Sequence, residues 1–324
     1  MIHRRGLAAA LALPLLARGA RAQSGYPTGP VRLIVPFAAG GTADVFARIV
    51  AEHLGGAFGK PFVVENAGGA GGVIGVSQLA RAKPDGQTLG LASTGALSIA
   101  PALNRGGVPY KVEDMAPVIQ ISVVPNVLVV NPGKVRARTV PELIEYLKAN
   151  PGKVAYGSAG VGTSQHLAAE LFQMMTGTGM VHVPYRGSSQ MLPDLIAGSV
   201  ELSFDNVPLV LPHVRDGKLR VLATATASRA EFDPALPAVA EYLPGFEATA
   251  WHGILAPART PRPVVAALAR EIGALMRQPA TQARFRDLGA VAVATGPDEF
   301  AALIASETRR WKEVIQTRDI KPET

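Results

Sequence analysis

Two loops in this chain carry the residue types that bind a small anion. The first is Pro36–Asp44, where glycines and a threonine stand between a short apolar run and a helical pattern. The second is Gly157–His166, which places glycine, threonine and serine in the same setting. Glycine lets the backbone approach a ligand, and the first turn of a helix has unpaired N–H groups with partial positive charge. Both loops therefore favour anion binding, although a purely structural strand-to-helix turn stays open as the alternative.

Enzyme motifs fit this sequence poorly. Tyr156–Gly160 misses the Gly-x-Ser-x-Gly nucleophile elbow at its first position. The glycines between residues 69 and 75 do not fit the dinucleotide pattern Gly-x-Gly-x-x-Gly, because position 74 is isoleucine. His166 and Glu170 lie four residues apart in a predicted helix, but two groups do not make a metal site. We therefore predict a binding protein with no catalytic residue, no metal site and no cofactor.

Three single side chains could add to such a site, and each has a structural alternative. His166 would line a cleft, or cap and pack its own helix. Asp205 ends a predicted strand and would contact the ligand, or form an Asx turn. Arg186 would meet an anion, or be an ordinary exposed arginine. The aromatic residues Phe37 and Trp251 are more typical of a core than of a ligand platform.

The elements that position these loops alternate between short strands and helices. The expected strands are residues 31–35, 61–65, 89–93, 118–130, 153–156, 180–185, 200–204, 219–225 and 249–256. The expected helices are residues 43–55, 73–82, 139–149, 165–175, 190–197, 264–276, 280–288 and 298–316. This alternation predicts an α/β protein with a mostly parallel sheet covered by helices on both faces. Ligands then bind beyond the carboxyl ends of the strands, which here are residues 36–42, 66–72 and 93–95.

Two features indicate that the chain folds as two similar lobes. Without its leader the chain has roughly 300 residues, enough for two domains. The strand, glycine loop and helix of residues 31–55 recur at residues 153–175. Between them, Val118–Val130 is a β-rich run longer than most single strands, so we expect it to cross from one domain to the other.

The N-terminus has the features of a secretory signal. The positively charged residues His3–Arg5 precede the apolar run Leu7–Leu16, and Ala20–Ala22 fits a small-x-small cleavage site. The apolar run is shorter than the roughly 20 residues that span a bilayer. We therefore expect residues 1–22 to be removed after Ala22 and the remainder to be a soluble periplasmic protein. The sequence does not decide between the general and the twin-arginine export route.

Charge and composition exclude several other classes of protein. The formal net charge is +7, but the leader holds four arginines and no acidic residue, so the remainder carries only +3. That remainder has no block of lysine and arginine, which argues against a nucleic-acid partner. The chain has no cysteine, which excludes disulfides, thiolate metal sites, cysteine catalysis and a lipid-modified N-terminal cysteine.

Segments along nearly the whole mature chain resemble one family of receptors. They are Pro30–Asp44, Gly69–Gly75, Pro84–Gly86, Tyr156–His166, Val183–Gly187, Phe204–Asn206 and Ala256–Pro257. In these segments the sequence resembles the Bug-type receptors, the periplasmic solute-binding proteins of tripartite tricarboxylate transporters. The resemblance implies a two-lobed, type II-like periplasmic binding protein, each lobe a mixed, mostly parallel sheet flanked by helices. It also implies a monomer that closes like a Venus flytrap on a small organic acid and delivers it to two membrane subunits.

The resemblance and the loop chemistry together define candidate lobes and ligand-binding residues. The first lobe is expected to be residues 23–124 with 248–324, and the second lobe residues 125–247. The first-lobe candidates are Phe37, Ala38, Ala39, Gly40, Gly41, Thr42, Asp44, Ser93 and Thr94. The second-lobe candidates are Ser158, Gly160, Gly162, Thr163, Ser164, His166, Arg186 and Asp205. The resemblance further implies that Asp205 faces the ligand and recognises an amino, hydroxyl or water-bridged group.

The chain departs from the family pattern at three places. Ala67–Gly68 stands where an Arg-Pro pair is usual, and Gln87 replaces a common aromatic residue. His252 follows Trp251 at a position where another aromatic residue is frequent. These positions bear on which acid is bound rather than on the fold. Two further functions stay open: a hydrolase or transferase on the same scaffold, and the extracytoplasmic ligand-binding partner of a sensor.

Overall fold

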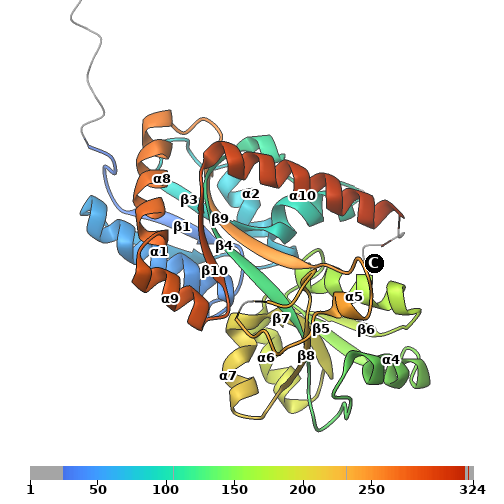
Figure 1. Cartoon of the computed structure of the whole chain (residues 1–324). Helices are drawn as coiled ribbons and strands as arrows, with labels where there is room; N and C mark the ends of the chain where they lie inside the picture. The colour runs from blue at the N-terminus through green and yellow to red at the C-terminus, as the bar shows by residue number, and fades with distance from the viewer. Residues whose placement is uncertain (1–24, 105, 231, 318–319, 321–324) are drawn as a thin grey trace, which may run out of the picture.

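The computed structural model describes residues 25–104, 106–230, 232–317 and 320 (Figure 1). The predicted leader, residues 1–22, lies outside the described residues. The described chain forms two halves, each a sheet flanked by helices, and both sheets include the long strand β4 (Met115–Val130).

The first half is built from the N-terminal and C-terminal parts of the chain. Its other strands are β1 (Val31–Val35), β2 (Phe62–Asn66), β3 (Thr88–Ser93), β9 (Thr249–Pro257) and β10 (Val291–Thr295). The strand order is β2-β1-β3-β9-β4, and β10 also pairs with β4. β1 is parallel to β2 and β3, whereas β9 is antiparallel to β3 and β4. The helices are α1 (Thr42–Phe58), α2 (Val73–Ala80), α3 (Ala100–Leu103), α8 (Arg262–Met276), α9 (Pro279–Asp287) and α10 (Pro297–Thr317).

The second half is the middle of the chain. Its strands are β5 (Ala155–Ser158), β6 (Val181–Pro184), β7 (Leu202–Asn206) and β8 (Arg220–Thr224). The strand order continues as β4-β7-β5-β6, with β8 also on β4. The helices are α4 (Val140–Ala149), α5 (Ser164–Thr176), α6 (Ser188–Ala197) and α7 (Val207–Arg215). In each half a glycine-rich loop leads from a parallel strand into a helix. Pro36–Asp44 leads from β1 into α1, and Gly157–His166 leads from β5 into α5.

The long strand β4 connects the two halves. It has 16 residues, pairs with β9 as far as Pro125, and pairs with β7 from Asn126 onward. Pro125 has no N–H for a sheet hydrogen bond, which suits a residue at the change of partner. Among the described strands four pairings are parallel and five are antiparallel. The sheets are thus more evenly mixed than expected, because β4 runs against each of its neighbours.

The predicted elements are present with small shifts at their ends, and three others were not predicted. α7 has Pro208 in its first turn, where proline is tolerated, but also Pro212 inside the helix, and a proline there argues against a helix in the sequence. β10 is a short strand between two helices, with no strong alternation of polar and apolar residues. Residues 95–103 form a π-helical turn that continues into α3, directly after β3.

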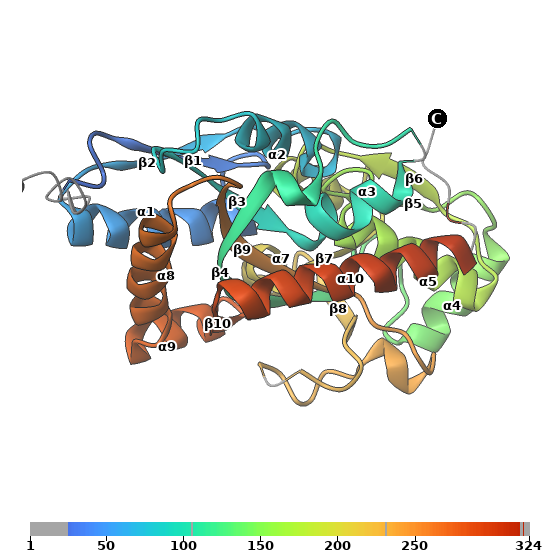
Figure 2. The same cartoon turned by 90° about the horizontal axis from the view of Figure 1, so that it is seen from above.

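The buried apolar side chains form separate cores in the two halves, and α10 belongs to both. Figure 2 shows α10 lying along the length of the molecule, over both halves. Its residue Phe300 packs edge-on against Trp251 in the first half, with ring centroids 5.4 Å apart. Its residue Trp311 belongs to the second-half cluster that includes Phe172 and Phe246. α10 therefore contributes to the stability of both cores.

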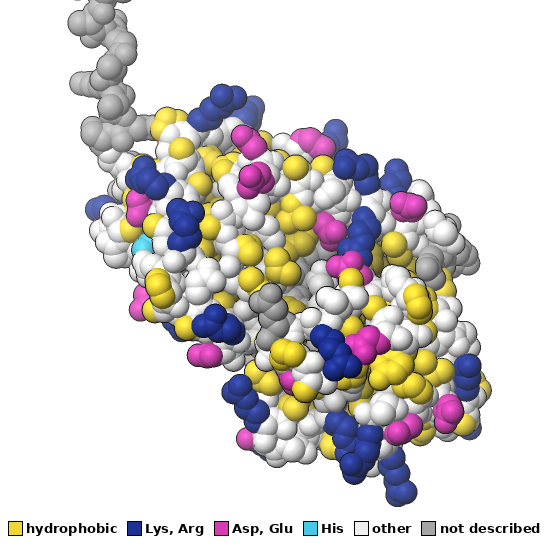
Figure 3. Space-filling view, viewed as in Figure 1, with side chains coloured by type: hydrophobic (Ala, Val, Ile, Leu, Met, Phe, Trp, Pro, Cys, Tyr) yellow, Lys and Arg dark blue, Asp and Glu magenta, His cyan; other side chains and the backbone are white. Residues whose placement is uncertain are grey.

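The surface carries interspersed charges. On the face shown in Figure 3, lysine and arginine alternate with aspartate and glutamate rather than gathering in one basic block. Among the described residues, no helix combines the length and the hydropathy needed to cross a membrane.

Candidate functional site

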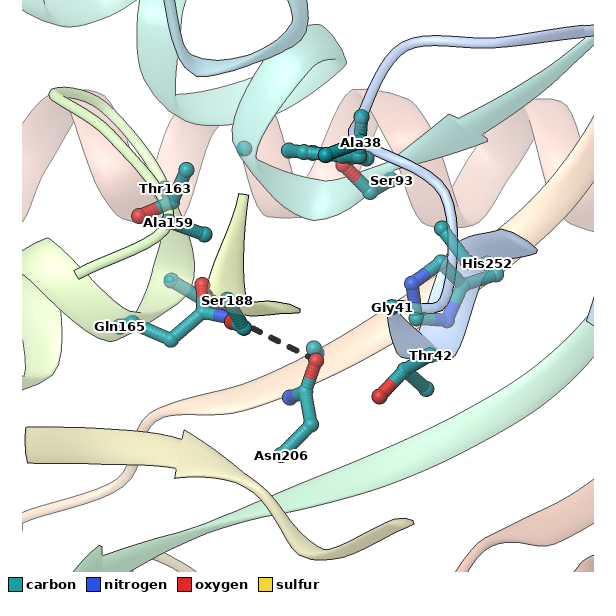
Figure 4. A pocket seen from close by; sticks show the side chains of 15 residues that line it. Ala38, Gly41, Thr42, Ser93, Ala159, Thr163, Gln165, Ser188, Asn206 and His252 are labelled. Carbon is teal, nitrogen blue, oxygen red and sulfur yellow. Dashed lines mark hydrogen bonds between the residues drawn. The ribbon is translucent and has the colours of Figure 1, made fainter. Parts of the chain in front are cut away.

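A small cavity lies between the two halves, where helices α1, α5, α6 and α7 begin (Figure 4). Its lining comes from the starts of these helices and from β3 and β9. The lining residues are Phe37, Ala38, Gly41, Thr42, Ala43, Ser93, Gly95, Ala159, Thr163, Ser164, Gln165, Ser188, Asn206, Ala250 and His252. No lysine or arginine of the described chain is among them. The groups that can attract an anion here are therefore the helix N-termini, with their partial positive charge and N–H groups.

The two walls of the cavity are close together. The free space between them is about 30 Å3, room for about two water molecules. Across the rim, the Ser189 hydroxyl in α6 donates a hydrogen bond to the Ala39 carbonyl at 2.8 Å. The two halves are therefore in direct contact across the rim of the cavity.

The start of α1 presents unpaired hydrogen-bond donors to the cavity. Gly41 is the N-cap and provides no side-chain hydrogen bond, so the N–H groups of Thr42 and Ala43 have no partner inside the helix. The Thr42 hydroxyl is buried and lacks a hydrogen-bond partner in the described part of the chain. Figure 4 places Thr42 on the wall opposite Gln165. A buried hydroxyl without a partner is costly, so a ligand oxygen at this position would be stabilised.

Asp44 holds the first loop from behind the wall. Its carboxylate accepts hydrogen bonds from the Gly40 N–H and Arg48 Nε at 2.9 Å each, and from Asn66 Nδ2 at 3.0 Å. Burial alone would raise the pKa of Asp44, but these hydrogen bonds and the charge of Arg48 outweigh it, so the pKa is lowered. Asn66 also donates to the Phe37 carbonyl at 3.1 Å. The carboxylate therefore positions the loop rather than lining the cavity.

Replacing Thr42 with valine should weaken ligand binding roughly tenfold, because one hydrogen bond is lost while the shape is kept. Calorimetric titration measures this change, and thermal unfolding should show that the fold is retained. Thr260 provides a matched control, since its hydroxyl is also buried without a partner among the described residues but does not line the cavity. Thr260→Val should leave affinity unchanged. Equal affinities for the native protein, Thr42→Val and Thr260→Val would show that the Gly41–Thr42 turn has only a structural role.

The opposite wall is formed by the starts of α5 and α6. Thr163 is the N-cap of α5: its hydroxyl accepts from the His166 N–H at 3.3 Å and donates to the Gly160 carbonyl at 2.7 Å. The N-cap of α6 is Gly187, which provides no side-chain hydrogen bond. The N–H group of Ser188 therefore has no partner inside its helix. Two further helix N-termini thus face the cavity from the second half.

Asp205 lies behind this second wall, next to Asn206. Its Oδ1 accepts hydrogen bonds from the Ser188 hydroxyl and the Asn206 N–H, both at 2.7 Å. Gln165 Nε2 makes a longer contact with the same oxygen, at 3.5 Å. Burial raises the pKa of Asp205 to about 6, and the hydrogen bonds from Ser188, Asn206 and Gln165 limit the rise. Two side chains of the cavity wall are therefore held by one buried carboxyl group.

The raised pKa of Asp205 gives a prediction for stability against pH. The folded protein favours protonated Asp205, so this stabilisation is complete below the unfolded pKa near 4 and is lost as pH rises through about 6. Asp205→Asn should therefore gain about 2 kcal/mol relative to the native protein between pH 4 and pH 7. Urea denaturation at several pH values measures the difference. A constant difference across this range would contradict the prediction.

His252 contributes a neutral imidazole to the first wall. Its Nδ1 lies 3.1 Å from the Ser122 hydroxyl, and its ring packs edge-on against Phe46 with centroids 5.6 Å apart. Burial lowers the pKa of His252 to about 4, so the ring is uncharged near neutral pH. The ring lines the cavity (Figure 4), and its polar edge can therefore meet a ligand without adding charge.

His166 caps and packs its own helix behind the cavity. Its Nδ1 accepts a hydrogen bond from the Gly162 N–H at 3.3 Å, and its ring stacks on His182 with centroids 4.5 Å apart. Burial, with a smaller effect of the neighbouring His182, lowers the pKa of His166 to about 3. The imidazole is therefore neutral and serves the shape of the α5 loop.

The structure brings some candidate residues to the cavity wall and places the others behind it or on the surface. Those on the wall are Phe37, Ala38, Gly41, Thr42, Ser93, Thr163 and Ser164. Those away from the wall are Ala39, Gly40, Asp44, Thr94, Ser158, Gly160, Gly162, His166, Arg186 and Asp205. Thr94 accepts a hydrogen bond from the Trp251 N–H at 2.9 Å and so supports β9. Arg186 is exposed.

The wall also contains residues that the sequence prediction missed. They are Ala43, Gly95, Ala159, Gln165, Ser188, Asn206, Ala250 and His252. Ala159 and Gln165 lie inside the second glycine loop, Gly157–His166, so the prediction of that loop was enough to indicate that they could line the site. His252 stands out in the sequence only as a departure from the family pattern. Ser188 and Ala250 have no local signal, because only the fold brings them to the cavity.

The two halves, the cavity between them and the converging helix termini give the architecture of a two-lobed α/β binding protein. Residues 46–320 match the family described as tripartite tricarboxylate transporter family receptor. The chain therefore belongs to this receptor family, and the Bug-type resemblance is confirmed. Members of the family are solute-binding receptors rather than enzymes, as the sequence predicted.

Individual relatives agree with this assignment. Protein BugT of Bordetella pertussis is 40% identical over 303 residues, which cover 91% of each chain. The solved structure of R. palustris Rpa4515 with adipate has a TM-score of 0.89 and 35% identity, and covers 92% of this chain and 100% of that one. MatC (Rpa3494) from Rhodopseudomonas palustris with bound malate has a TM-score of 0.85 and 29% identity, with coverages of 90% and 100%.

Proposed function

We propose that this protein captures a small carboxylate-containing solute between two lobes and delivers it to the membrane subunits of a tripartite tricarboxylate-type transporter. The observation that carries the proposal is the meeting of four helix starts at one cavity without a lysine or arginine among its described lining. Partial positive charge and unpaired N–H groups at these termini suit a carboxylate. The relatives solved with adipate and malate support this class of ligand.

In this proposal the lobes are residues 23–124 with 248–324, and residues 125–247. The hinge includes the change of partner of β4 at Pro125 and Asn126. The receptor works as a monomer in the periplasm after removal of residues 1–22. A hinge motion separates the lobes to admit the solute, and contacts of the solute with both lobes favour closure.

The ligand contacts follow from the two walls. One carboxylate accepts hydrogen bonds from the Thr42 hydroxyl and from the N–H groups of Thr42 and Ala43. The other end of the solute meets Ser164, Gln165 and Ser188 from the second lobe. The remaining candidate residues behind the walls, such as Asp44, keep these donors in place.

A thermal-shift screen of organic acids, including adipate and malate, tests the proposal. We expect at least one acid to raise the melting temperature, to bind with one-to-one stoichiometry in calorimetry, and to be recovered unchanged. Conversion of the acid to a product would favour the hydrolase or transferase alternative. The absence of any stabilising acid would contradict the proposed ligand class. For delivery, deletion of the receptor should abolish growth of its host on that acid, whereas unaffected growth would favour a sensing role.

A further inference from the structure

Asp205 is a carboxyl group buried without a positive partner in the described part of the chain. It is 0% exposed, and its Oδ2 has no hydrogen-bond partner among the residues that the structure describes. An ionised carboxylate is costly in such a place, because neither water nor a counter-charge stabilises it. The pKa of Asp205, raised by burial to about 6, agrees with this environment. The protonated and the ionised forms are therefore both accessible near neutral pH.

The other ionisable groups around β7 do not contribute to the raised pKa of Asp205. The elements packed against β7 are β4, β5, α5, α6 and α7, and β4 has no ionisable residue. The ionisable residues on the other four are Tyr156, His166, Glu170, Asp194, His213 and Arg215. None of them is among the causes of the pKa shift of Asp205. Across the cavity, His252 is neutral near pH 6 and Asp44 is ion-paired with Arg48 at 2.9 Å.

The proton on Asp205 decides what Ser188 can offer to the cavity. While Asp205 is ionised, the Ser188 hydroxyl donates its hydrogen to Oδ1 at 2.7 Å, and only its lone pairs can face a ligand. Once Asp205 is protonated on Oδ1, that O–H can donate to Ser188 Oγ. The Ser188 hydrogen is then free to point into the cavity. A carboxylate ligand accepts hydrogen bonds only, so it favours this second arrangement.

The Gln165 amide can also reorient when Asp205 is protonated. Its Nε2 lies 3.5 Å from Asp205 Oδ1, 3.4 Å from Ser188 Oγ and 3.4 Å from Asn206 Oδ1. Three contacts of this length are weak, so the amide can turn its hydrogens towards a ligand at low cost. Charge adds to the effect, because a ligand carboxylate beside an ionised Asp205 is repelled in a site with little water.

We propose that closure on the carboxylate ligand is coupled to the uptake of one proton by Asp205, which converts Ser188 from an acceptor into a donor toward the ligand. The proton comes from solvent, binds to the Asp205 carboxylate, and returns to solvent when the lobes open and the ligand leaves. No other bond forms or breaks. The inference rests on the proposed function, since it requires an anionic ligand in this cavity.

Calorimetry with adipate and malate at pH 7, in two buffers of different ionisation enthalpy, counts the protons taken up on binding. We expect the native protein to take up more than half a proton, and its affinity to fall by up to about tenfold per pH unit above pH 7. Asp205→Asn should take up no proton, and its affinity should be flat with pH. Asp194→Asn is the matched control, because Asp194 is also held by a hydroxyl, that of Tyr185 at 2.6 Å, but does not line the cavity. This control should keep the native proton uptake.

Zero uptake by the native protein, or equal uptake by Asp205→Asn, would overturn the coupling. A second measurement needs no ligand: carbon-13 NMR of labelled aspartate carboxyl groups, with the Asp205 signal assigned through Asp205→Asn. A midpoint near 6 supports the proton site, and a midpoint near 4, the ordinary value for aspartate, overturns it. Failure of both acids to bind at any pH would count against the proposed ligand class, while the NMR titration would still decide the proton site.

Discussion

Gly71→Ala should lower ligand affinity at least hundredfold, because the two halves can then no longer close. Gly71 lies in the turn Ala70–Gly72, before α2, and faces the second half of the molecule. A Cβ atom at this position would overlap the carbonyl oxygen of Val161. The obstacle is backbone, so no side-chain rotation relieves the overlap. A facing glycine, Gly160, is less tightly restricted, since its Cβ would lie 3.0 Å from the Tyr185 carbonyl oxygen and 3.2 Å from the Gly71 nitrogen.

The size of the effect follows from what closure provides. In the open form the ligand contacts the donors of one wall only, so it loses several hydrogen bonds at once. A hundredfold loss of affinity corresponds to about 2.7 kcal/mol, or two to three such bonds. Calorimetry with the acid found in the screen measures this loss. Small-angle X-ray scattering should show that the native protein contracts when this acid is added, whereas the Gly71→Ala variant does not.

Gly59 provides the matched control for backbone strain. Its φ is 63° and that of Gly71 is 62°, so alanine is equally disfavoured at both positions. Nothing lies within 4 Å of a Cβ atom at Gly59, which ends α1 away from the cavity. Gly59→Ala should therefore lose stability but keep its affinity. Equal losses of affinity in both variants would show that strain, not closure, is responsible.

Local sequence features predicted most of the fold, because each one has a local physical cause. β1 consists of buried branched residues apart from the exposed Arg32, Pro36 follows it, and Gly40 and Gly41 define the loop. The helix α4 begins at the predicted N-cap, where the Thr139 hydroxyl accepts a hydrogen bond from the Glu142 N–H at 3.3 Å. Such signals act over a few residues and do not depend on the tertiary structure.

The second wall of the cavity depends on contacts that no local pattern encodes. Ser188 and Asp205 are 17 residues apart, and they meet because β7 lies beside β5 and α6 packs against both. His252 reaches the first wall only because the C-terminal part of the chain returns as β9 between β3 and β4. The sequence thus predicted the two loops but not which side chains complete the site. Asp44 lies away from the cavity wall and fixes the first loop through its hydrogen bonds, and its contact with a ligand stays a prediction.

Trp311→Ala should destabilise the protein by about 3–5 kcal/mol, the usual cost of deleting a buried tryptophan side chain. Trp311 is 1% exposed and lies in α10, which begins on the core of the first half and ends on that of the second. Its indole N–H donates to Glu307 Oε2 at 3.1 Å, within the same helix. Alanine would leave a cavity in the second-half core, where Trp311 and Ile315 both hold the end of α10.

Urea denaturation, followed by circular dichroism, measures the free energy of unfolding of this variant. Lys312→Ala is the matched control, because Lys312 is the next residue of the same helix and is exposed, so its change should stay within about 0.5 kcal/mol. Trp311→Phe should lose less than Trp311→Ala, since phenylalanine refills part of the space. A loss below about 1 kcal/mol for Trp311→Ala would mean that α10 is not needed to hold the second-half core. A loss of 3–5 kcal/mol would show that the end of α10 is an integral part of the second-half core, although the helix begins on the core of the first half.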